Sequence, residues 1–208
     1  MLPLKKSGTG TRAIIVASGP SVAGFTPPRG VPIIAVNTAI DWVDRASYFF
    51  TLDPSRENLR RMKHRRRGTQ YCCALPPAHA DIPGVYRFER IGDHSTRGPE
   101  PEEKGTPAWW LWRWSCMPGL ATEAGKIHSG NSAYGALGLA LHLGYTDVAL
   151  VGVDGTQAPR HHDGGTPNDL SHLGLLFASA LPQINVVSCG LLDSIPQMTL
   201  KEWLEKTR

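Results

Sequence analysis

Residues 129–157 read SGNSAYGALGLALHLGYTDVALVGVDGTQ, which predicts a helix, a turn and a buried strand in succession. A polar turn at 129–131 precedes a helix of small and apolar residues. This helix is expected to end at Gly144. The apolar run 148–153 is short enough to be a strand buried on both faces. Asp154 follows this strand, and ligands of open parallel sheets bind outside the carboxyl ends of the strands. We therefore expect a functional site around Asp154.

Five predicted strands precede this helix, and the first three each end in polar residues. The other two are a short strand at 70–75 and an edge strand at 85–90, where apolar and polar residues alternate. The runs 13–17, 31–36 and 48–52 are apolar and rich in β-branched or aromatic side chains, as buried strands are. Parallel strands place their carboxyl ends at one sheet edge, so these polar groups favour a ligand cleft there. The predicted fold class is α/β, a Rossmann-like, mostly parallel sheet with helices on both faces. The residues expected at this edge are Ser18, Gly19, Pro20, Ser21, Asn37, Asp53, Ser129, Gly130 and Asn131.

Each of these clusters also has a purely structural interpretation. Gly19 and its neighbours could present N–H groups to a phosphate, or could simply turn the chain into a helix. This segment has neither the three glycines of a dinucleotide fingerprint nor the Lys of a P-loop. Asn37 could pair with a base edge or a ribose, or could cap a helix. Asp53 could bind a ribose, a sugar hydroxyl or a metal, or could also be a cap.

The composition is that of an ordinary globular protein, with 208 residues, 41% hydrophobic and 19% charged. We expect a single domain over residues 1–208. No apolar run approaches the roughly 20 residues of a membrane span, and the first residues lack the apolar core of a signal peptide. We therefore expect no membrane partner. The four Cys have no metal-ligand spacing, so we expect them to be reduced thiols in a cytoplasmic protein. The net charge of +4 permits an anionic partner without requiring one.

A basic run occupies residues 56–67, where seven of twelve residues are Lys or Arg. If the run is helical, Arg56, Arg60, Lys63 and Arg67 share one face. The run could be a solvated helix face, a contact for nucleic-acid phosphates or a site for a donor pyrophosphate. The predicted nucleic-acid contacts in this run are Arg60, Lys63, Arg65, Arg66 and Arg67.

Residues 91–124 lack a regular pattern and contain four Trp within 109–114. A long irregular segment in a compact domain is often an active-site lid, so we expect a lid subdomain here. The tryptophans could form a hydrophobic plug, a dimer contact or a stacking platform for a sugar or base. Trp110 and Arg113 are the predicted acceptor contacts, and an oligomer is compatible with this surface.

A polar loop at 158–169 carries the predicted catalytic residues. His161 or His162 could act as a general base toward a hydroxyl, with Asp163 or Asp154 orienting it. His-His-Asp in direct succession seldom converges on one ion, so we predict no metal. The alternative is an exposed polar loop. Beyond it, the sequence predicts a helix at 170–181 that begins near His172, a strand at 184–189 and a terminal helix at 199–206.

The order of these motifs resembles the bacterial sialyltransferase family (glycosyltransferase family 42) and its relatives, which include a pterin pyrophosphokinase-like group. The motifs are strand-Ser-Gly-Pro-Ser, strand-Asn, strand-Asp-Pro-Ser, Ser-Gly before the small-residue helix, and strand-Gly-Val-Asp. The chain is also similar to small phage-type proteins of unassigned function, which share the Gly-x-Asp strand, the His/Asp/Gly loop and a Leu-rich terminal helix. These short matches run through most of residues 13–206 and imply a GT-A-like fold.

In the sialyltransferases these clusters hold a CMP-sugar donor. The resemblance implies that residues 18–21 lie near the donor phosphate and ribose, that Asn37 and Asp53 contact the nucleotide or sugar, and that Ser129 and Gly130 contact the base or phosphate. It also implies a His general base in the loop after the Gly-x-Asp strand, without a metal.

The chain departs from that family at four positions. The family has Asn where Ser18 and Asp53 stand. It has tyrosines, which assist phosphate departure, where Gly155 and Thr156 stand. These differences leave the donor open between UDP- and CMP-linked sugars.

We therefore expect a metal-independent glycosyltransferase that uses a nucleotide sugar as co-substrate and no cofactor. The basic run, the tryptophans and the phage-type resemblance favour DNA with a hydroxymethylated base as the acceptor. The alternatives are a pterin-type pyrophosphokinase and a non-catalytic phage assembly or binding protein on the same fold.

Overall fold

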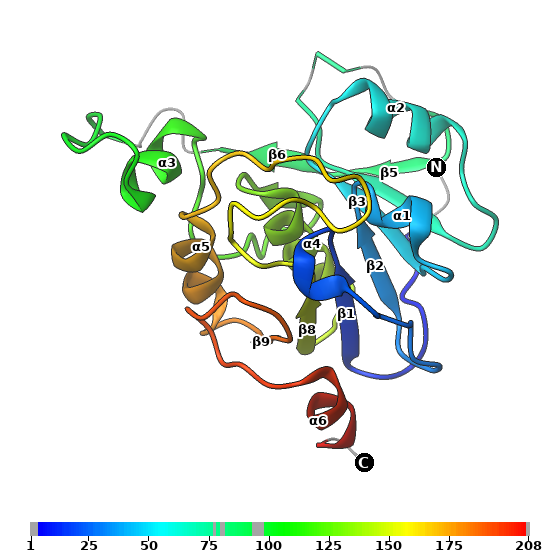
Figure 1. The fold of residues 1–208 in the computed structure, drawn as a ribbon. Coiled ribbons are helices and arrows are strands. Elements are labelled where there is room, and N and C mark those ends of the chain that lie inside the picture. The colour runs from blue at the N-terminus through cyan, green and yellow to red at the C-terminus, as the bar shows by residue number, and fades with distance from the viewer. Residues whose placement is uncertain (1–3, 77, 80–81, 93–97, 207–208) are drawn as a thin grey trace.

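A parallel sheet forms the centre of the computed structural model, which describes residues 4–76, 78–79, 82–92 and 98–206 (Figure 1). Within these ranges, seven parallel strands pair in the order β5-β4-β3-β2-β1-β8-β9. Two further strands, β6 (Glu89–Ile91) and β7 (Lys126–His128), pair in parallel beside it. The strands of the main sheet are β1 (Arg12–Val16), β2 (Ile33–Val36), β3 (Tyr48–Thr51), β4 (Gln70–Cys73), β5 (Val85–Arg87), β8 (Asp147–Val151) and β9 (Asn185–Ser188).

Helices cover both faces of the sheet. The helix α4 and the helix α5 pack with one hydrophobic cluster, and α1, α2 and α6 pack with the other. This arrangement confirms the predicted Rossmann-like α/β fold. The helical bounds are η1 (Pro20–Val22, a 3-10 turn), α1 (Ala39–Trp42), α2 (Arg56–Lys63), α3 (Pro107–Arg113), α4 (Ser132–His142), α5 (Leu173–Ala180) and α6 (Leu200–Glu205).

The strand order has a topological switch point between β1 and β8. From β1 the chain adds β2 to β5 on one side, whereas β8 and β9 extend the other side. Val16 pairs with Val151, so the two central strands end level with each other. Such a switch point leaves a crevice between the two diverging loops, and it is the usual ligand site of this architecture.

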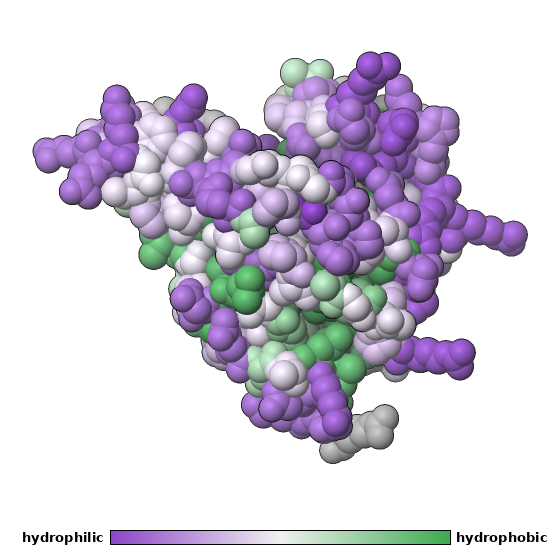
Figure 2. Space-filling model, viewed as in Figure 1, coloured by the Kyte–Doolittle hydropathy of each residue, from purple (hydrophilic) through white to green (hydrophobic). Residues whose placement is uncertain are grey.

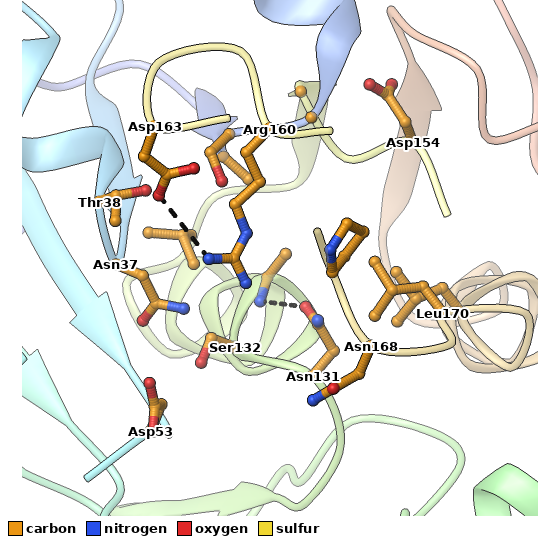
Figure 3. A pocket seen from close by; sticks show the side chains of 18 of the residues that line it. Asn37, Thr38, Asp53, Asn131, Ser132, Asp154, Arg160, Asp163, Asn168 and Leu170 are labelled. Atoms are coloured by element: carbon orange, nitrogen blue, oxygen red, sulfur yellow. Dashed lines mark hydrogen bonds and ion pairs between the residues drawn. The ribbon is translucent and has the colours of Figure 1, made fainter. Parts of the chain in front are cut away.

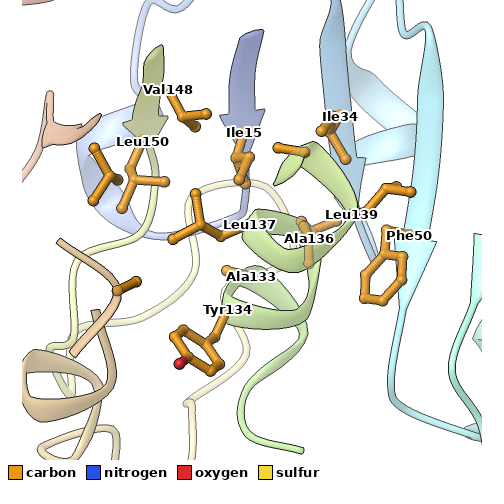
Figure 4. Packing of buried hydrophobic residues seen from close by; sticks show 14 of the residues in the cluster. Ile15, Ile34, Phe50, Ala133, Tyr134, Ala136, Leu137, Leu139, Val148 and Leu150 are labelled. Atoms are coloured by element: carbon orange, nitrogen blue, oxygen red, sulfur yellow. The ribbon is translucent and has the colours of Figure 1, made fainter. Parts of the chain in front are cut away.

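The small residues of α4 let this helix lie close against the sheet. Ala133, Ala136 and Leu137 face the strand side chains, which include Ile15 and Phe50 (Figure 4). A Cβ built on Gly135 would stand 2.7 Å from the Phe50 ring, so a larger residue there would push the helix outward. The N-terminus of α4 is thereby held beside the carboxyl ends of β1 and β3.

Three predicted elements differ in their bounds. The predicted edge strand at 85–90 is divided, because buried Phe88 separates β5 in the main sheet from β6 in the small one. The strand expected at 148–153 ends at Val151, since Gly152 adopts a left-handed φ of 69°. The basic run is helical only to Lys63.

The terminal helix begins as its sequence predicts. Thr199 and Glu202 form a reciprocal capping box at the start of α6. Among the described residues, no helix combines the length and apolar character needed to cross a bilayer. All four Cys are thiols rather than disulfides.

Candidate functional site

A pocket of about 560 Å³ opens at the carboxyl ends of β1, β2, β3 and β8 (Figure 3). Its walls are the loops that follow these strands, the first turn of α4 and the loop from Gly152 to Leu170. The volume falls within the range of small-molecule sites. The pocket therefore lies at the sheet edge where the sequence predicts a ligand cleft.

The pocket brings together most of the residues expected to hold a donor. Ser21, Ser129 and Gly130 are not among the residues that line it. Ser129 is buried, where its hydroxyl accepts hydrogen bonds from the Arg90 guanidinium. The expected residues that do line the pocket are Ser18, Gly19, Pro20, Asn37, Asp53, Asn131, Asp154 and Asp163.

Asp154 ties three loops together beneath the pocket. Its Oδ2 accepts a hydrogen bond from Ser21 N (2.8 Å), and its Oδ1 accepts bonds from Ser21 Oγ (2.5 Å) and Leu191 N (3.1 Å). Ser21 Oγ in turn accepts a hydrogen bond from Gly152 N. We call this arrangement the Asp154 clasp. No hydrogen bond within the described residues joins Asp154 to a histidine, so its carboxylate supports the pocket wall.

Two glycines make room for the clasp. A Cβ on Gly19 would stand 2.5 Å from Asp154 Oδ2 and 2.7 Å from Gly152 O. A Cβ on Gly190 would come closer to Asp154 Oδ1 and Ser21 Oγ than van der Waals contact permits. The Ser-Gly-Pro-Ser turn thus needs its glycine for close approach to Asp154, which lies far away in the sequence.

A buried amide network positions the polar side chains that follow β2 and β3. Asn58 is 1% exposed, and its Nδ2 donates to Asn37 Oδ1 (3.2 Å) and Asp53 Oδ2 (3.0 Å). Its Oδ1 accepts from Arg61, whose guanidinium also pairs with Asp41. Asn37 has a φ of 51°, a conformation that Asn tolerates better than most residues. The Asn58 network therefore fixes two pocket side chains from different strands.

Replacing Asn58 by Ala is expected to destabilise the protein by about 2 kcal/mol, because the buried Asn58 amide loses its hydrogen bonds with Asn37, Asp53 and Arg61. Urea unfolding checks this expectation. The matched control is Asn185→Ala, since Asn185 is exposed on β9. Equal unfolding free energies for the two variants would contradict the network's role.

Arg160 carries a positive charge into the pocket. Its guanidinium points toward Asn37 and the first turn of α4 (Figure 3), with Nη1 3.7 Å from Asp163 Oδ2. The other lining guanidinium, Arg61, is matched by Asp41 outside the pocket. Arg160 N and Gly164 N hydrogen-bond within the loop, and His161 N donates to Ser18 O. This loop is thereby tied over the end of β1.

The two candidate general bases lie on the rim of this loop. His161 and His162 are exposed, and neither lines the pocket. His162 stacks on Trp42 of α1 with ring centroids 4.1 Å apart, and His161 meets His162 edge to face at 4.6 Å. Their catalytic role stays a prediction. His172, the N-cap residue of α5, is buried. Burial lowers its pKa, and the negative charge of Asp169 acts in the opposite direction.

The predicted nucleic-acid contacts of the basic run fall into two groups. Arg65 donates to Met62 O and Pro83 O, and Arg66 donates to the carbonyls of residues 40, 43 and 44. These two guanidiniums hold the fold together. Arg60, Lys63 and Arg67 are exposed and make no ion pair with another described residue.

Helix α3, which carries Trp110 and Arg113, projects from the body of the molecule (Figure 1). None of its residues is fully buried, and Trp110 stacks on Trp114 with centroids 5.8 Å apart. The pocket lining includes no described residue of 91–124, and residues 93–97 of the expected lid lie outside the described ranges. The lid role stays a prediction.

Sequence reasoning missed several lining residues. Asn58 and Arg61 line the pocket but are not among the predicted site residues; they belong to the basic run, which is interpreted from the sequence as a solvated face, a nucleic-acid contact or a donor-pyrophosphate site. Arg160 could have been found as the one cation between the Gly-x-Asp strand and the next helix. Within the described residues, no group of three or more His, Cys, Asp or Glu is placed to hold a metal ion.

Comparison with known proteins identifies the fold. No protein-family model and no curated protein sequence matches this chain. Among solved structures, the chain is similar to the MAf glycosyltransferase from Magnetospirillum magneticum AMB-1, with a TM-score of 0.51 and 14% sequence identity. The likeness covers 94% of this chain and 35% of that one, so this chain spans about a third of that protein's length. The two share the fold. The sialyltransferase and phage-type resemblances stay predictions.

Proposed function

We propose that this protein is a glycosyltransferase that transfers a sugar from a nucleotide-sugar donor to an acceptor hydroxyl. The observation that carries the proposal is the polar pocket at the switch point between β1 and β8, which places Arg160, Asn37 and Asp53 around one cavity. The shared fold with the MAf glycosyltransferase supports it. The nucleotide is UDP or CMP, no cofactor takes part, and we place the reaction in the cytoplasm, the host cytoplasm if the chain is phage-encoded.

The donor phosphate would lie between Arg160 and the N-terminus of α4. The N–H groups of the first helical turn and the guanidinium both favour negative charge there. Asn131 caps this helix through a hydrogen bond from Ala133 N to Oδ1 (2.7 Å). The amide of Asn37 and the carboxylate of Asp53 are suited to ribose or sugar hydroxyls.

In the transfer step, the acceptor oxygen forms a bond to the anomeric carbon as the bond from that carbon to the phosphate oxygen breaks. The acceptor proton passes to a base on the loop 158–169, His161 or His162, with Asp163 of the same loop as its orienting carboxylate. Arg160 and the α4 N-terminus stabilise the charge that develops on the leaving phosphate. The acceptor that we propose is a hydroxymethylated base of DNA.

Nucleotide binding is expected to raise the melting temperature of the protein. A free ligand concentration of 100 times the Kd stabilises the native state by about 2.7 kcal/mol. For a chain of this size that is a rise of roughly 5–10 °C. Arg160→Ala is expected to weaken CMP or UDP binding about tenfold or more through loss of a charged hydrogen bond. Arg29→Ala is the matched control, because Arg29 is exposed and away from the pocket.

The same screen separates the rival functions. A shift with ATP and Mg²⁺ together with ATP consumption would favour a pyrophosphokinase. For transfer itself, the mass of an oligonucleotide that contains 5-hydroxymethylcytosine is measured after incubation with UDP- and CMP-sugars. An unchanged mass with every donor contradicts the proposal for this acceptor. Undiminished transfer by a His161→Ala/His162→Ala variant would show that the general base is another residue.

A further inference from the structure

We infer that the outer face of α2 binds the phosphate backbone of a nucleic acid and guides it to the pocket. This inference rests on the proposed function and names the surface that would bind its nucleic-acid acceptor. The basic run alone does not establish it, because three of its cations are engaged within the protein. Those three are Arg61, Arg65 and Arg66.

Three of the four remaining cations of the run form one exposed face, and the fourth, Arg67, lies beyond the end of α2. Arg56, Arg60 and Lys63 line a shallow groove of about 480 Å³ together with Glu57 and Leu59. No ion pair with another described residue neutralises these three cations. With three cations and the carboxylate of Glu57, the groove lining carries a net charge of +2. A cationic cluster of this kind binds a polyanion, and the release of counterions drives the association.

The groove adjoins the pocket. Glu57 lines both cavities, and Asn58 and Arg61 of the same helix line the pocket. A strand held in the groove therefore passes beside the pocket mouth. A base of that strand can then present its hydroxyl to the donor, after the base has left its stack.

The spacing of the cations fits a phosphate backbone. Residues 56 and 63 are seven helical steps apart, which is about 10.5 Å along the axis of α2. Successive phosphates of one strand advance about 3.4 Å along a duplex axis, so the face spans roughly three of them.

The chemistry of this face favours nucleic acid over a membrane surface. Helices that lie on membranes combine basic residues with an exposed apolar face. Leu59 is only partly exposed and packs against the core. The surface over α2, at the upper right of the view, is mostly hydrophilic (Figure 2).

The test is the salt dependence of oligonucleotide binding by the full chain, measured by fluorescence anisotropy with labelled single- and double-stranded 20-mers. The variant Arg60→Gln/Lys63→Gln is expected to bind roughly tenfold or more weakly at 100 mM salt. Its slope of log K against log salt should be smaller by about 1.4 for single strands and about 1.8 for duplexes. The control Lys201→Gln/Lys206→Gln removes the same charge from α6 and its C-cap, at the other end of the molecule (Figure 1), and should retain the wild-type slope.

An equal loss of affinity in both variants, or none in either, overturns the inference. So does binding to phosphatidylserine vesicles without binding to oligonucleotides. The proposed function is tested separately, since Arg60→Gln/Lys63→Gln should bind CMP or UDP as the wild type does. If no nucleotide binds but the anisotropy result holds, the transferase proposal fails and the nucleic-acid face stands.

Discussion

Replacing Gly152 by Ala is expected to destabilise the protein by at least about 3 kcal/mol, the largest effect of any substitution proposed for this chain. Gly152 has a φ of 69°, which side chains disfavour, and its carbonyl accepts a hydrogen bond from Gly19 N. A Cβ there would stand 2.9 Å from the carbonyl carbon of Ala17 and closer still to its oxygen. Both clashes are with backbone, so the ends of β1 and β8 must separate. Thermal unfolding should show a fall of roughly 6–12 °C.

Gly164→Ala is the matched control for this substitution. Gly164 also has a left-handed φ, 63°, but no atom lies within 4 Å of its added Cβ. It should lose only about 1 kcal/mol through backbone strain. A Gly152→Ala variant as stable as Gly164→Ala would show that the close contact at the switch point is not needed.

Asp154→Ala is expected to cost about 3 kcal/mol, because Ser21 N, Ser21 Oγ and Leu191 N all lose a charged acceptor at a site that is 6% exposed. The loops after β1, β8 and β9 should loosen together. Nucleotide binding should weaken as a consequence, even though Asp154 is not assigned a chemical step. Urea unfolding and the thermal-shift screen measure the two effects.

An exposed carboxylate provides the comparison. Asp193→Ala removes the same group from the surface and should change stability by less than about 0.5 kcal/mol. If Asp154→Ala retained wild-type stability but lost transfer activity, the carboxylate would have a catalytic role in place of the supporting one.

The polar pocket could be predicted from the sequence because of a general property of parallel sheets. Every strand that ends in a polar residue delivers it to the same edge, so Asn37, Asp53 and Asp154 are expected together from strand order alone. The prediction needs only the apolar runs and the polar residues directly after them. It could not distinguish Asp53, whose carboxylate lines the cavity, from Ser21, which is not among the lining residues and binds Asp154.

Residue type alone could not separate binding from support in the basic run. Arg60 and Arg66 have the same side chain and lie six positions apart. Only the folded chain brings the carbonyls of α1 to Arg66 and leaves Arg60 in solvent. The position of His162 could not be predicted from the sequence either. Its ring stacks on Trp42 only because the loop after β8 contacts α1 in the folded chain.

The amino-acid sequence by itself determined the strands, the small-residue helix α4 and the common edge, because hydrophobic periodicity and glycine placement are local properties of the chain. The tertiary structure alone decided which polar groups point into the pocket, which cations remain unpaired and how the glycines enclose the Asp154 clasp. These outcomes depend on contacts between residues far apart in the sequence, from 20 positions for Arg61 and Asp41 to 133 for Ser21 and Asp154. Local pattern contains no information on the direction in which such distant side chains meet.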